Sequence, residues 1–414
     1  MRRGEPFDTA LERGLASLAE VDRRLVHELA AGVLRQQGPL DTAIAPHVSR
    51  GIGQVEPALL DILRLATYQI HHLDRVPPHA AVATAVDLAR QAVGERATGF
   101  VNAVLRKVAR GRPAPAAPEP DTAAALAGEF SHPEWLVTRW LERFGRDETR
   151  ALLEWNNAHP PLVIQPARGS VDELANRLGE AKVPHFLAPF GAGVVVDETR
   201  PDRIPGFDEG DWFVQDPAQA LVTRYAGFPE DAVVYDACAA PGGKALALHD
   251  SVARVVAADL SRRRLERLLE NLSRLAAPNV HPVVADAMQP PVRPVGAVLV
   301  DAPCLGTGTF ARHPDARHRV RPEALARLVA EQAALLDAAA DRVRTGGVLC
   351  YATCSLEPEE DGEQVDRFLA RRRDFRREPA TGDDLPLTAA GDLLLLPQRH
   401  GTDGAFAARL VRTG

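Results

Sequence analysis

The sequence lacks the features of a membrane or secreted protein. No apolar run approaches the roughly 18 residues that a membrane-spanning helix needs. The first residues contain neither an apolar stretch nor a small-residue cleavage site, so no secretion signal is indicated. We therefore expect a cytoplasmic protein without a membrane partner. The net charge of -7 argues mildly against a surface that binds nucleic acid everywhere, although a local basic face is compatible with it.

Cysteine and lysine are both scarce. The cysteines all lie in the C-terminal half of the chain: Cys238, Cys304, Cys350 and Cys354. They form none of the spaced pairs that build disulfide frameworks or zinc ribbons, so free thiols are expected and no metal site is predicted. Only three of the 49 basic residues are lysines, and one of them, Lys244, lies in a glycine-rich loop.

The length of 414 residues predicts two or three domains at about 150 residues each. Apolar residues three and four positions apart predict helices in the first part, a proline-rich stretch predicts a stiff linker, and short strand-like runs around one helix indicate a small α+β subdomain. The predicted segments are a helical domain at 1–110, a linker at 111–121, a helical connector at 122–160, the α+β subdomain at 161–228 and an α/β domain at 229–414.

Continuous apolar runs separated by amphipathic helices follow residue 229. This pattern predicts a doubly wound, mostly parallel sheet with helices on both faces. The predicted strands are 232–236, 254–259, 280–284, 297–300, 348–351 and 393–396. In such a sheet ligands bind outside the carboxyl ends of the strands, so the residues directly after each strand are the candidates for a site.

A glycine-rich turn follows the first of these strands. It is not a Walker A loop, because Cys238 stands where that motif needs glycine and Ala245 stands where it needs a hydroxyl. It is not a dinucleotide fingerprint either, because G-x-G-x-x-G is missing. Paired glycines let the backbone approach a ligand, and Asp259, about twenty positions on, is placed to accept hydrogen bonds from ribose hydroxyls. This pattern suits an adenosine-bearing cofactor without a pyrophosphate, namely S-adenosylmethionine.

Acidic residues stand at the ends of successive strands: Asp236, Asp259, Asp286 and Asp301. Any one of them is more simply explained as a cap or a turn former, but together they favour a site. On this hypothesis Asp286 lies near the adenine and Asp301 at the centre of the site.

Two thiols, Cys304 and Cys354, also follow strands of the predicted sheet. Carbon 5 of a cytosine or uracil is a poor nucleophile until a thiolate adds to carbon 6, so these thiols indicate pyrimidine methylation. The chemistry alone leaves the two nearly even as the nucleophile. Cys350 lies inside an apolar strand and is interpreted as a core residue. A zinc site built from these three cysteines lacks a fourth ligand.

Four motifs together resemble the RNA cytosine-5 methyltransferases of the RsmB (Sun) type. They are DACAAPGGK at 236–244, DAPCLGTG at 301–308, RHPD at 312–315 and YATCSLEPEE at 351–360. Residues 81–89 and 99–106 are similar to the NusB-like RNA-binding helical domain that this type carries before its catalytic domain. The resemblance implies an all-α NusB-like N-terminal domain, a small α+β subdomain and an α/β Rossmann-like methyltransferase domain that uses S-adenosyl-L-methionine.

The resemblance also implies roles for individual residues. Cys354 would attack carbon 6 of the target cytosine, Asp301 would hydrogen-bond the ring near nitrogen 3, and Cys304 would assist proton removal from carbon 5 and enzyme release. The residues that would line the S-adenosylmethionine site are Cys238, Ala239, Ala240, Pro241, Gly242, Gly243, Lys244, Asp259, Asp286 and Asp301.

Two further segments bear on RNA binding. Ile-Gln-Pro at 164–166 stands where the family has Arg-Val-Asn, a departure at one expected RNA or substrate contact. The basic segment 312–321 directly follows the Cys304 loop and is favoured as a contact to phosphates.

The predicted function is therefore the formation of 5-methylcytosine in RNA by an S-adenosylmethionine-dependent methyltransferase. The expected substrate is small-subunit (16S) ribosomal RNA with a single-stranded or splayed-out cytosine, and no DNA partner is expected. Two alternatives stay open: the same chemistry on transfer RNA, and a catalytically lapsed RNA-binding or assembly protein. The NusB-like segment favours ribosomal RNA, and the intact Cys304, Cys354 and Lys244 argue against lapse.

Overall fold

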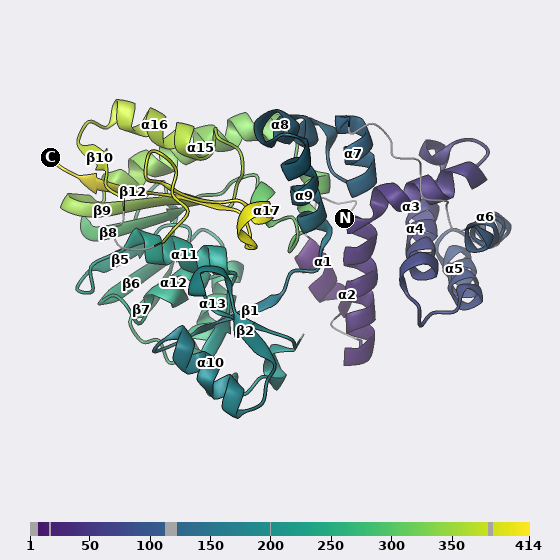
Figure 1. Cartoon of the computed structure of the whole chain (residues 1–414), viewed down its shortest axis with the longest axis horizontal. Helices are drawn as coiled ribbons and strands as arrows, with labels where there is room; N and C mark the ends of the chain where they lie inside the picture. The colour runs from purple at the N-terminus through teal and green to yellow at the C-terminus, as the bar shows by residue number, and fades with distance from the viewer. Residues whose placement is uncertain (1–6, 16–17, 112–121, 199, 380–383) are drawn as a thin grey trace. The chain divides into compact units, whose positions relative to one another are not determined.

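The computed structural model in Figure 1 describes residues 7–15, 18–111, 122–198, 200–379 and 384–414. The linker predicted at 111–121 lies, except for Gly111, outside the described residues. None of the described helices has both the length and the apolar character needed to cross a membrane.

Two compact units make up the chain. The first consists of residues 1–158 and 310–320, and the second of residues 159–309 and 321–414. The short segment Phe310–Val320, which the sequence analysis placed within an α/β domain at 229–414, therefore belongs to the first unit. Its apolar and buried side chains explain this assignment, because they pack onto the helices of that unit rather than onto the sheet.

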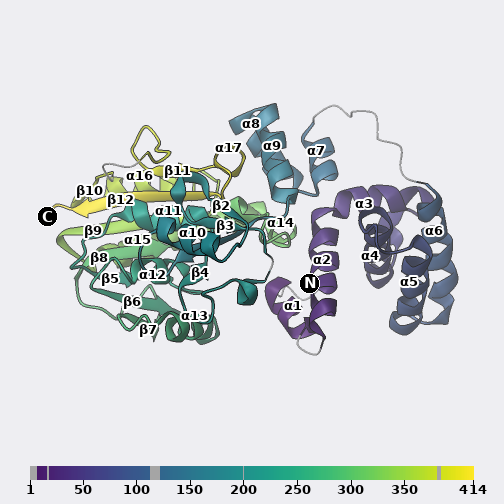
Figure 2. The same cartoon turned by 60° about the horizontal axis from the view of Figure 1, so that its bottom comes forward.

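The first unit is helical throughout its described part (Figure 2). Its helices are α1 (Phe7–Leu15), α2 (Glu20–Arg35), α3 (Gln37–Ile44), α4 (Pro57–His72), α5 (Pro78–Ala92), α6 (Thr98–Arg110), α7 (Ala123–Phe130), α8 (Glu134–Phe144), α9 (Arg146–Asn157) and α14 (Ala316–Arg319). Leu63 of α4 and Val101 of α6 are fully buried in a common core. Gly32 lets α2 approach α4, because a Cβ atom at this position would lie 2.1 Å from Cζ of Tyr68.

Arg317 of α14 is completely buried in this unit. Its guanidinium donates to the carbonyl oxygens of Asn156 (2.6 Å) and Phe310 (3.0 Å) and to the side chain of Asn157. Burial lowers the pKa of Arg317 to about 9. The expectation that the whole segment 312–321 contacts RNA phosphates is therefore wrong for Arg317, because its donors are used to attach α14 to α9.

The second unit begins with a small antiparallel sheet of order β2-β3-β1-β4. Its elements are β1 (Leu162–Pro166), α10 (Val171–Glu180), β2 (His185–Leu187), β3 (Val194–Val196) and β4 (Trp212–Val214). Ile164 is fully buried in β1, and the side chain of Gln165 donates to the carbonyl oxygens of Ala192 (3.0 Å) and Gln215 (3.4 Å). The residues that depart from the family pattern at 164–166 thus hold this subdomain together.

The larger sheet has the order β10-β12-β9-β8-β5-β6-β7. Its strands are β5 (Val233–Asp236), β6 (Arg254–Asp259), β7 (Val280–Val284), β8 (Val295–Asp301), β9 (Val343–Thr353), β10 (Phe375–Arg377), β11 (Leu393–Leu395) and β12 (Ala405–Arg412). The four pairs β8–β9, β5–β8, β5–β6 and β6–β7 are parallel, as predicted. β12 was not predicted and runs antiparallel to β9, and β11 pairs with β12 instead of extending the parallel part.

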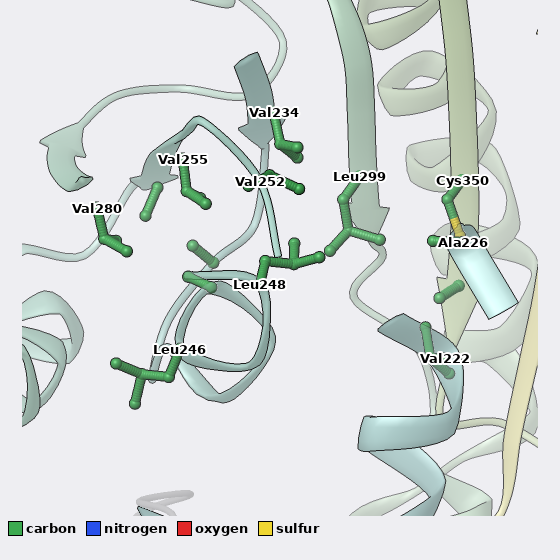
Figure 3. Packing of buried hydrophobic residues seen from close by; sticks show 14 of the residues in the cluster. Val222, Ala226, Val234, Leu246, Leu248, Val252, Val255, Val280, Leu299 and Cys350 are labelled. Carbon is green, nitrogen blue, oxygen red and sulfur yellow. The ribbon is translucent and has the colours of Figure 1, made fainter. Parts of the chain in front are cut away.

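Side chains of the larger sheet alternate between two cores. Val234 and Leu299 point toward α11, α12 and α13, whereas Tyr235 and Val298 point toward α15 and α16. These helices span Pro217–Ala226, Gly243–Leu248, Arg262–Leu275, Pro322–Ala340 and Gly362–Arg371, respectively. Figure 3 shows Cys350 within the first core, beside α11, which confirms its interpretation as a core residue.

Replacing Arg317 tests its structural role. We expect Arg317→Met to lower the free energy of unfolding by roughly 2–4 kcal/mol, because buried carbonyl acceptors lose their donors. Arg90→Met is the control, since this side chain is 45% exposed and pairs with the exposed carboxylates of Asp87 and Glu95. Its cost should stay below about 1 kcal/mol. Chemical denaturation measures both, and equal losses would contradict the assignment.

Candidate active site

The carboxyl ends of the parallel strands meet at one edge of the larger sheet. β5, β6 and β8 end at Asp236, Asp259 and Asp301, and β9 ends at Thr353, directly before Cys354. Because Asp301 pairs with Ala352, the acidic group of β8 and the thiol loop after β9 are neighbours. The parallel pairing therefore brings together the residues that the sequence analysis selected from separate motifs.

A buried ion pair lies at the centre of this edge. Nζ of Lys244, at the start of α12, is 2.6 Å from Oδ2 of Asp301 and also donates to the side-chain oxygen of Gln219. Burial by itself lowers the pKa of Lys244, but the carboxylate of Asp301 more than offsets this effect and holds the pKa above its ordinary value. Lys244 is therefore a permanent positive charge that fixes Asp301.

Asp236 is the most unusual carboxyl group of the site. It is fully buried at the end of β5, and neither of its oxygens has a partner with hydrogen-bond geometry among the described residues. Burial raises its pKa to about 8, and the nearby Asp301 adds to this rise. Asp236 is therefore largely protonated at neutral pH, and it has polar capacity to spare for a ligand.

The glycine-rich turn is packed closely against neighbouring side chains, which leaves no room for a side chain at Gly242 and little at Gly243. Gly242 has φ of +110°, and a Cβ atom there would lie 2.5 Å from the side chain of Leu268. At Gly243 a Cβ atom would lie 3.1 Å from Nε2 of Gln215, a buried amide whose side-chain atoms have no hydrogen-bond partner among the described residues. The unpaired buried polar groups of Gln215 and Asp236 on this edge fit a small polar ligand.

Two of the predicted ligand-binding acids already have local partners. Oδ1 of Asp259 accepts from the Ser261 N–H (2.7 Å) and from Arg264 (2.8 Å), and Oδ2 accepts from the Ala240 N–H (3.3 Å). A carboxylate has about four acceptor positions, so Asp259 retains capacity for one more donor. Asp286 is exposed after β7, and its Oδ1 accepts from the Met288 N–H (2.9 Å).

The two candidate catalytic thiols lie side by side. The Sγ atoms of Cys304 and Cys354 are 3.4 Å apart, and both residues are partly exposed. The hydrogen bond with Cys354, together with burial, raises the pKa of Cys304 well above its ordinary value. Cys238, in the glycine-rich turn, likewise has a raised pKa, first because of burial and then because of Asp236. Cys304 and Cys238 are therefore thiols at neutral pH.

A single buried carboxylate holds the two thiol loops together. Glu360 accepts from the Leu305 N–H (3.1 Å), from the hydroxyl of Ser355 (2.5 Å) and from the side chain of Gln332 (2.9 Å). Leu305 follows Cys304, and Ser355 follows Cys354 in the sequence. Glu360 occurred in the 351–360 motif without an assigned role. The only feature that could have indicated a role for Glu360 was its acidic side chain in a stretch that is mostly buried.

Backbone hydrogen bonds add a third loop to this arrangement. The N–H of Gly308 donates to the carbonyl oxygen of Cys354 (2.9 Å), and the N–H of Gly404 donates to the carbonyl oxygen of Gly308 (2.8 Å). A Cβ atom at Gly308 would lie 2.7 Å from Cα of Gly404, so no side chain fits here. The loop before β12 thus lies against the thiol loops, which no sequence pattern indicated.

The first unit contains a separate groove of about 810 Å³ between α5 and α6. Val82 and Val86 of α5 line one side, and Asn102, Arg106 and Arg110 line the other. Among the residues that the structure describes, no group of His, Cys, Asp and Glu side chains is arranged to hold a metal ion.

The strand order and the glycine-rich turn define the class of the second unit, which is that of the Rossmann-like methyltransferases. Family profiles match three parts of the chain. Residues 227–411 match the 16S rRNA methyltransferase RsmB/F family, residues 2–110 match the NusB family, and residues 132–201 match the ferredoxin-like domain of RsmF/B-like methyltransferases.

Full-length relatives narrow the class to a family. The chain is 35% identical to the probable ribosomal RNA small subunit methyltransferase B of Synechocystis, with 99% of this chain and 96% of the relative covered. It is 33% identical to the ribosomal RNA small subunit methyltransferase B of Pseudomonas putida, with 98% and 94% covered. The chain therefore belongs to the RsmB/F family of 16S rRNA methyltransferases.

Solved structures agree with this fold. The crystal structure of PH0851 is similar, with a TM-score of 0.80 and 25% identity over 97% of this chain and 93% of that chain. A methyltransferase homologue from Pyrococcus horikoshii has a TM-score of 0.61 and 22% identity over 72% of this chain and all of the other. The fold class predicted from the sequence, with a NusB-type helical domain, a small α+β subdomain and a methyltransferase domain, is confirmed.

Removing the Glu360 carboxylate should separate the thiol loops. We expect a mild oxidant to form the disulfide between Cys304 and Cys354 up to about tenfold more slowly in Glu360→Ala than in the wild type. The loops should move apart in this variant, because each unpaired buried donor costs roughly 1–3 kcal/mol. Glu360→Gln keeps one acceptor oxygen and should lie in between. Glu363→Ala, which removes an exposed carboxylate, is the control. Mass spectrometry measures the disulfide, and a wild-type rate in folded Glu360→Ala would contradict this role.

Asp236 predicts a pH dependence of stability. Its pKa is raised in the folded state, so the folded chain holds a proton that the unfolded chain releases, and stability falls as the pH rises toward about 8. Asp236→Asn removes this effect. The stability of the variant relative to the wild type should rise from about pH 5 to about pH 8 by up to roughly 1.4 kcal/mol per pH unit. Urea denaturation at both pH values tests this, and a flat or falling difference would refute it.

Proposed function

We propose that the protein transfers a methyl group from S-adenosyl-L-methionine to carbon 5 of a cytosine in small-subunit (16S) ribosomal RNA, through a covalent adduct with Cys354. The observation that carries the proposal is the pair of Cys304 and Cys354 sulfurs, 3.4 Å apart, in loops next to the ion pair of Asp301 and Lys244. Membership of the RsmB/F family supports it.

The predicted cofactor residues suit S-adenosylmethionine, which supplies the methyl group when it is bound. Residues 238–244 would surround it, with Asp259 and Asp286 completing the site. The unpaired polar atoms of Asp236 and Gln215 support this proposal, because a ligand with an ammonium and a carboxylate group would provide their missing partners.

The family motif at 351–360 favours Cys354 as the nucleophile. A thiolate is needed to attack carbon 6, and the raised pKa keeps Cys304 protonated at neutral pH. Lys244 holds Oδ2 of Asp301, which would leave Oδ1 to hydrogen-bond the ring near nitrogen 3. After methyl transfer, carbon 5 still carries a proton. Its removal falls to Cys304, which lies next to Cys354 and can accept this proton only after its own thiol proton has passed to solvent. The electron pair of the carbon–hydrogen bond then expels the sulfur of Cys354 from carbon 6, and the base is released.

RNA is the proposed partner of both units. Relatives with full coverage are named ribosomal RNA small subunit methyltransferases, which favours 16S rRNA over transfer RNA. In the first unit, Arg106 and Arg110 lie one helical turn apart along one wall of the groove, a spacing that suits phosphate contacts. A thiol can reach carbon 6 only from the face of the ring, so the target nucleotide must be unpaired or splayed out.

Transfer of labelled methyl groups tests the function directly. We expect 5-methylcytosine in unmethylated small-subunit ribosomal RNA and no label in bulk transfer RNA, with the base identified by mass. Label in transfer RNA would reassign the substrate and keep the chemistry. No label in either RNA, in a sample that binds S-adenosylmethionine, would overturn the proposal in favour of an RNA-binding or assembly role.

The same assay separates the roles of the cysteines. Cys354→Ala should abolish transfer and leave cofactor affinity within a few fold, whereas Cys304→Ala should accumulate a denaturant-resistant protein–RNA species because release is slowed. Cys350→Ala is the control. It replaces a buried thiol within β9, the strand that precedes Cys354, and should remain active. Activity retained by Cys354→Ala would transfer the role of nucleophile to Cys304.

A further inference from the structure

The turn after β2 presents an aromatic side chain in an unusual backbone conformation. Phe190 has φ of +59° and ψ of 20°, in the left-handed region that bulky residues rarely adopt, and it is 36% exposed. Burial of the ring does not account for this conformation. Strain of this kind persists where the surroundings fix the residue, and it is common at functional sites.

The surroundings of Phe190 do fix it. The buried side chain of Gln165 in β1 donates to the carbonyl oxygen of Ala192, two residues after Phe190 (3.0 Å). Arg224 of α11 donates to the carbonyl oxygen of Phe190 itself (3.1 Å). The turn is therefore held from two sides, and the phenyl ring is presented at little further entropic cost to a ligand.

A second ring lies next to Phe190. His400, at the end of α17 (Pro397–His400), has its ring centroid 5.9 Å from that of Phe190, at an interplanar angle of 59°. Its Nδ1 accepts from the Leu396 N–H (2.8 Å), which orients the imidazole and leaves the proton of the neutral ring on Nε2. The two rings form a fixed aromatic corner rather than a closed stack.

This aromatic corner is connected to the thiol loops by a short stretch of chain. Gly401 follows His400 and lies against Pro189, since a Cβ atom at Gly401 would be 3.6 Å from Cγ of the Pro189 ring. Three residues later, Gly404 donates to the carbonyl oxygen of Gly308 in the Cys304 loop. Three residues span at most about 11 Å, so this short stretch of chain keeps the aromatic corner near the Cys304 loop.

We propose that Phe190 and His400 form a stacking surface for an RNA base next to the target cytosine. This inference rests on the proposed function and names a contact of its substrate. Single-stranded RNA is commonly held by stacking of unpaired bases on aromatic side chains, together with cationic groups that contact phosphates. Arg399, exposed and adjacent to His400, gives this aromatic corner the positive charge that such a strand needs.

Equilibrium binding of the full-length protein tests the surface without methyl transfer. The probe is a short single-stranded RNA that contains the cytosine mapped in the methyl-transfer assay. We expect Phe190→Ala to bind about 5- to 150-fold more weakly, Phe190→Trp to bind like the wild type, and the salt dependence to keep its slope. Phe186→Ala is the matched control, because Phe186 is 63% exposed in the same subdomain and has no ring contact within the described part of the chain. An equal loss in this control would overturn the proposal.

An abasic scan identifies the base. Each RNA in the scan lacks one base beside the target cytosine. The loss of RNA affinity caused by Phe190→Ala should disappear on one of these RNAs and persist on the others. A loss of the same size on every abasic RNA would show that no base stacks on Phe190. His400→Ala should show the same dependence on the same position.

Phe190→Gly separates the contact from a structural role. Glycine adopts positive φ without strain, so the unfolding midpoint should not fall while the RNA affinity does. A lower midpoint with unchanged affinity would assign Phe190 to folding alone. If the wild type methylates RNA and Phe190→Ala binds it normally, only the stacking surface is refuted. If the wild type neither binds nor methylates RNA, the proposed function fails as well.

Discussion

The geometry of the active site depends on the carboxylate of Glu360. Its donors come from the loop after β8, from the loop after β9 and from α15, and all of them are buried. A buried donor without an acceptor is costly, so none of these segments can shift without losing a hydrogen bond. Glu360 joins the two thiol loops together with two further hydrogen bonds, from the Gly308 N–H to the carbonyl oxygen of Cys354 and from the Leu356 N–H to the hydroxyl of Thr307. In this arrangement the two sulfurs lie 3.4 Å apart.

Electrostatics impose a second constraint on the same edge of the sheet. Asp236, Asp259 and Asp301 end neighbouring strands, and Lys244 is the one buried lysine among the described residues. Lys244 compensates Asp301 directly, and Asp236 avoids a second uncompensated charge by remaining largely protonated. The site thus concentrates polar groups at the cost of stability that is lost as the pH rises toward the pKa of Asp236. Such a cost is typical of sites arranged for ligands rather than for packing.

The aromatic corner and the thiol loops are linked through the same short segment before β12. Gly404 hydrogen-bonds to the Cys304 loop, and His400, four residues earlier, lies against Phe190 of the small subdomain. The small subdomain and the methyltransferase sheet therefore share one structural connection at the active site. Gln165, which replaces the residue usual in the family, contributes by holding the turn of Phe190 instead of facing a substrate.

Local patterns were sufficient for the parallel strands and for the residues that follow them, because buried strands need continuous apolar runs and ligands bind at their carboxyl ends. The motif at 236–244 and the two thiols are therefore recognisable from the sequence as a candidate site. Other features depend on partners far away in the chain. β12 contains alternating and charged residues that resemble a surface segment, Arg317 resembles a phosphate contact, and Glu360 resembles a surface acid. Their burial and their hydrogen bonds arise only when distant segments meet, and this long-range contact information is absent from any short window of sequence.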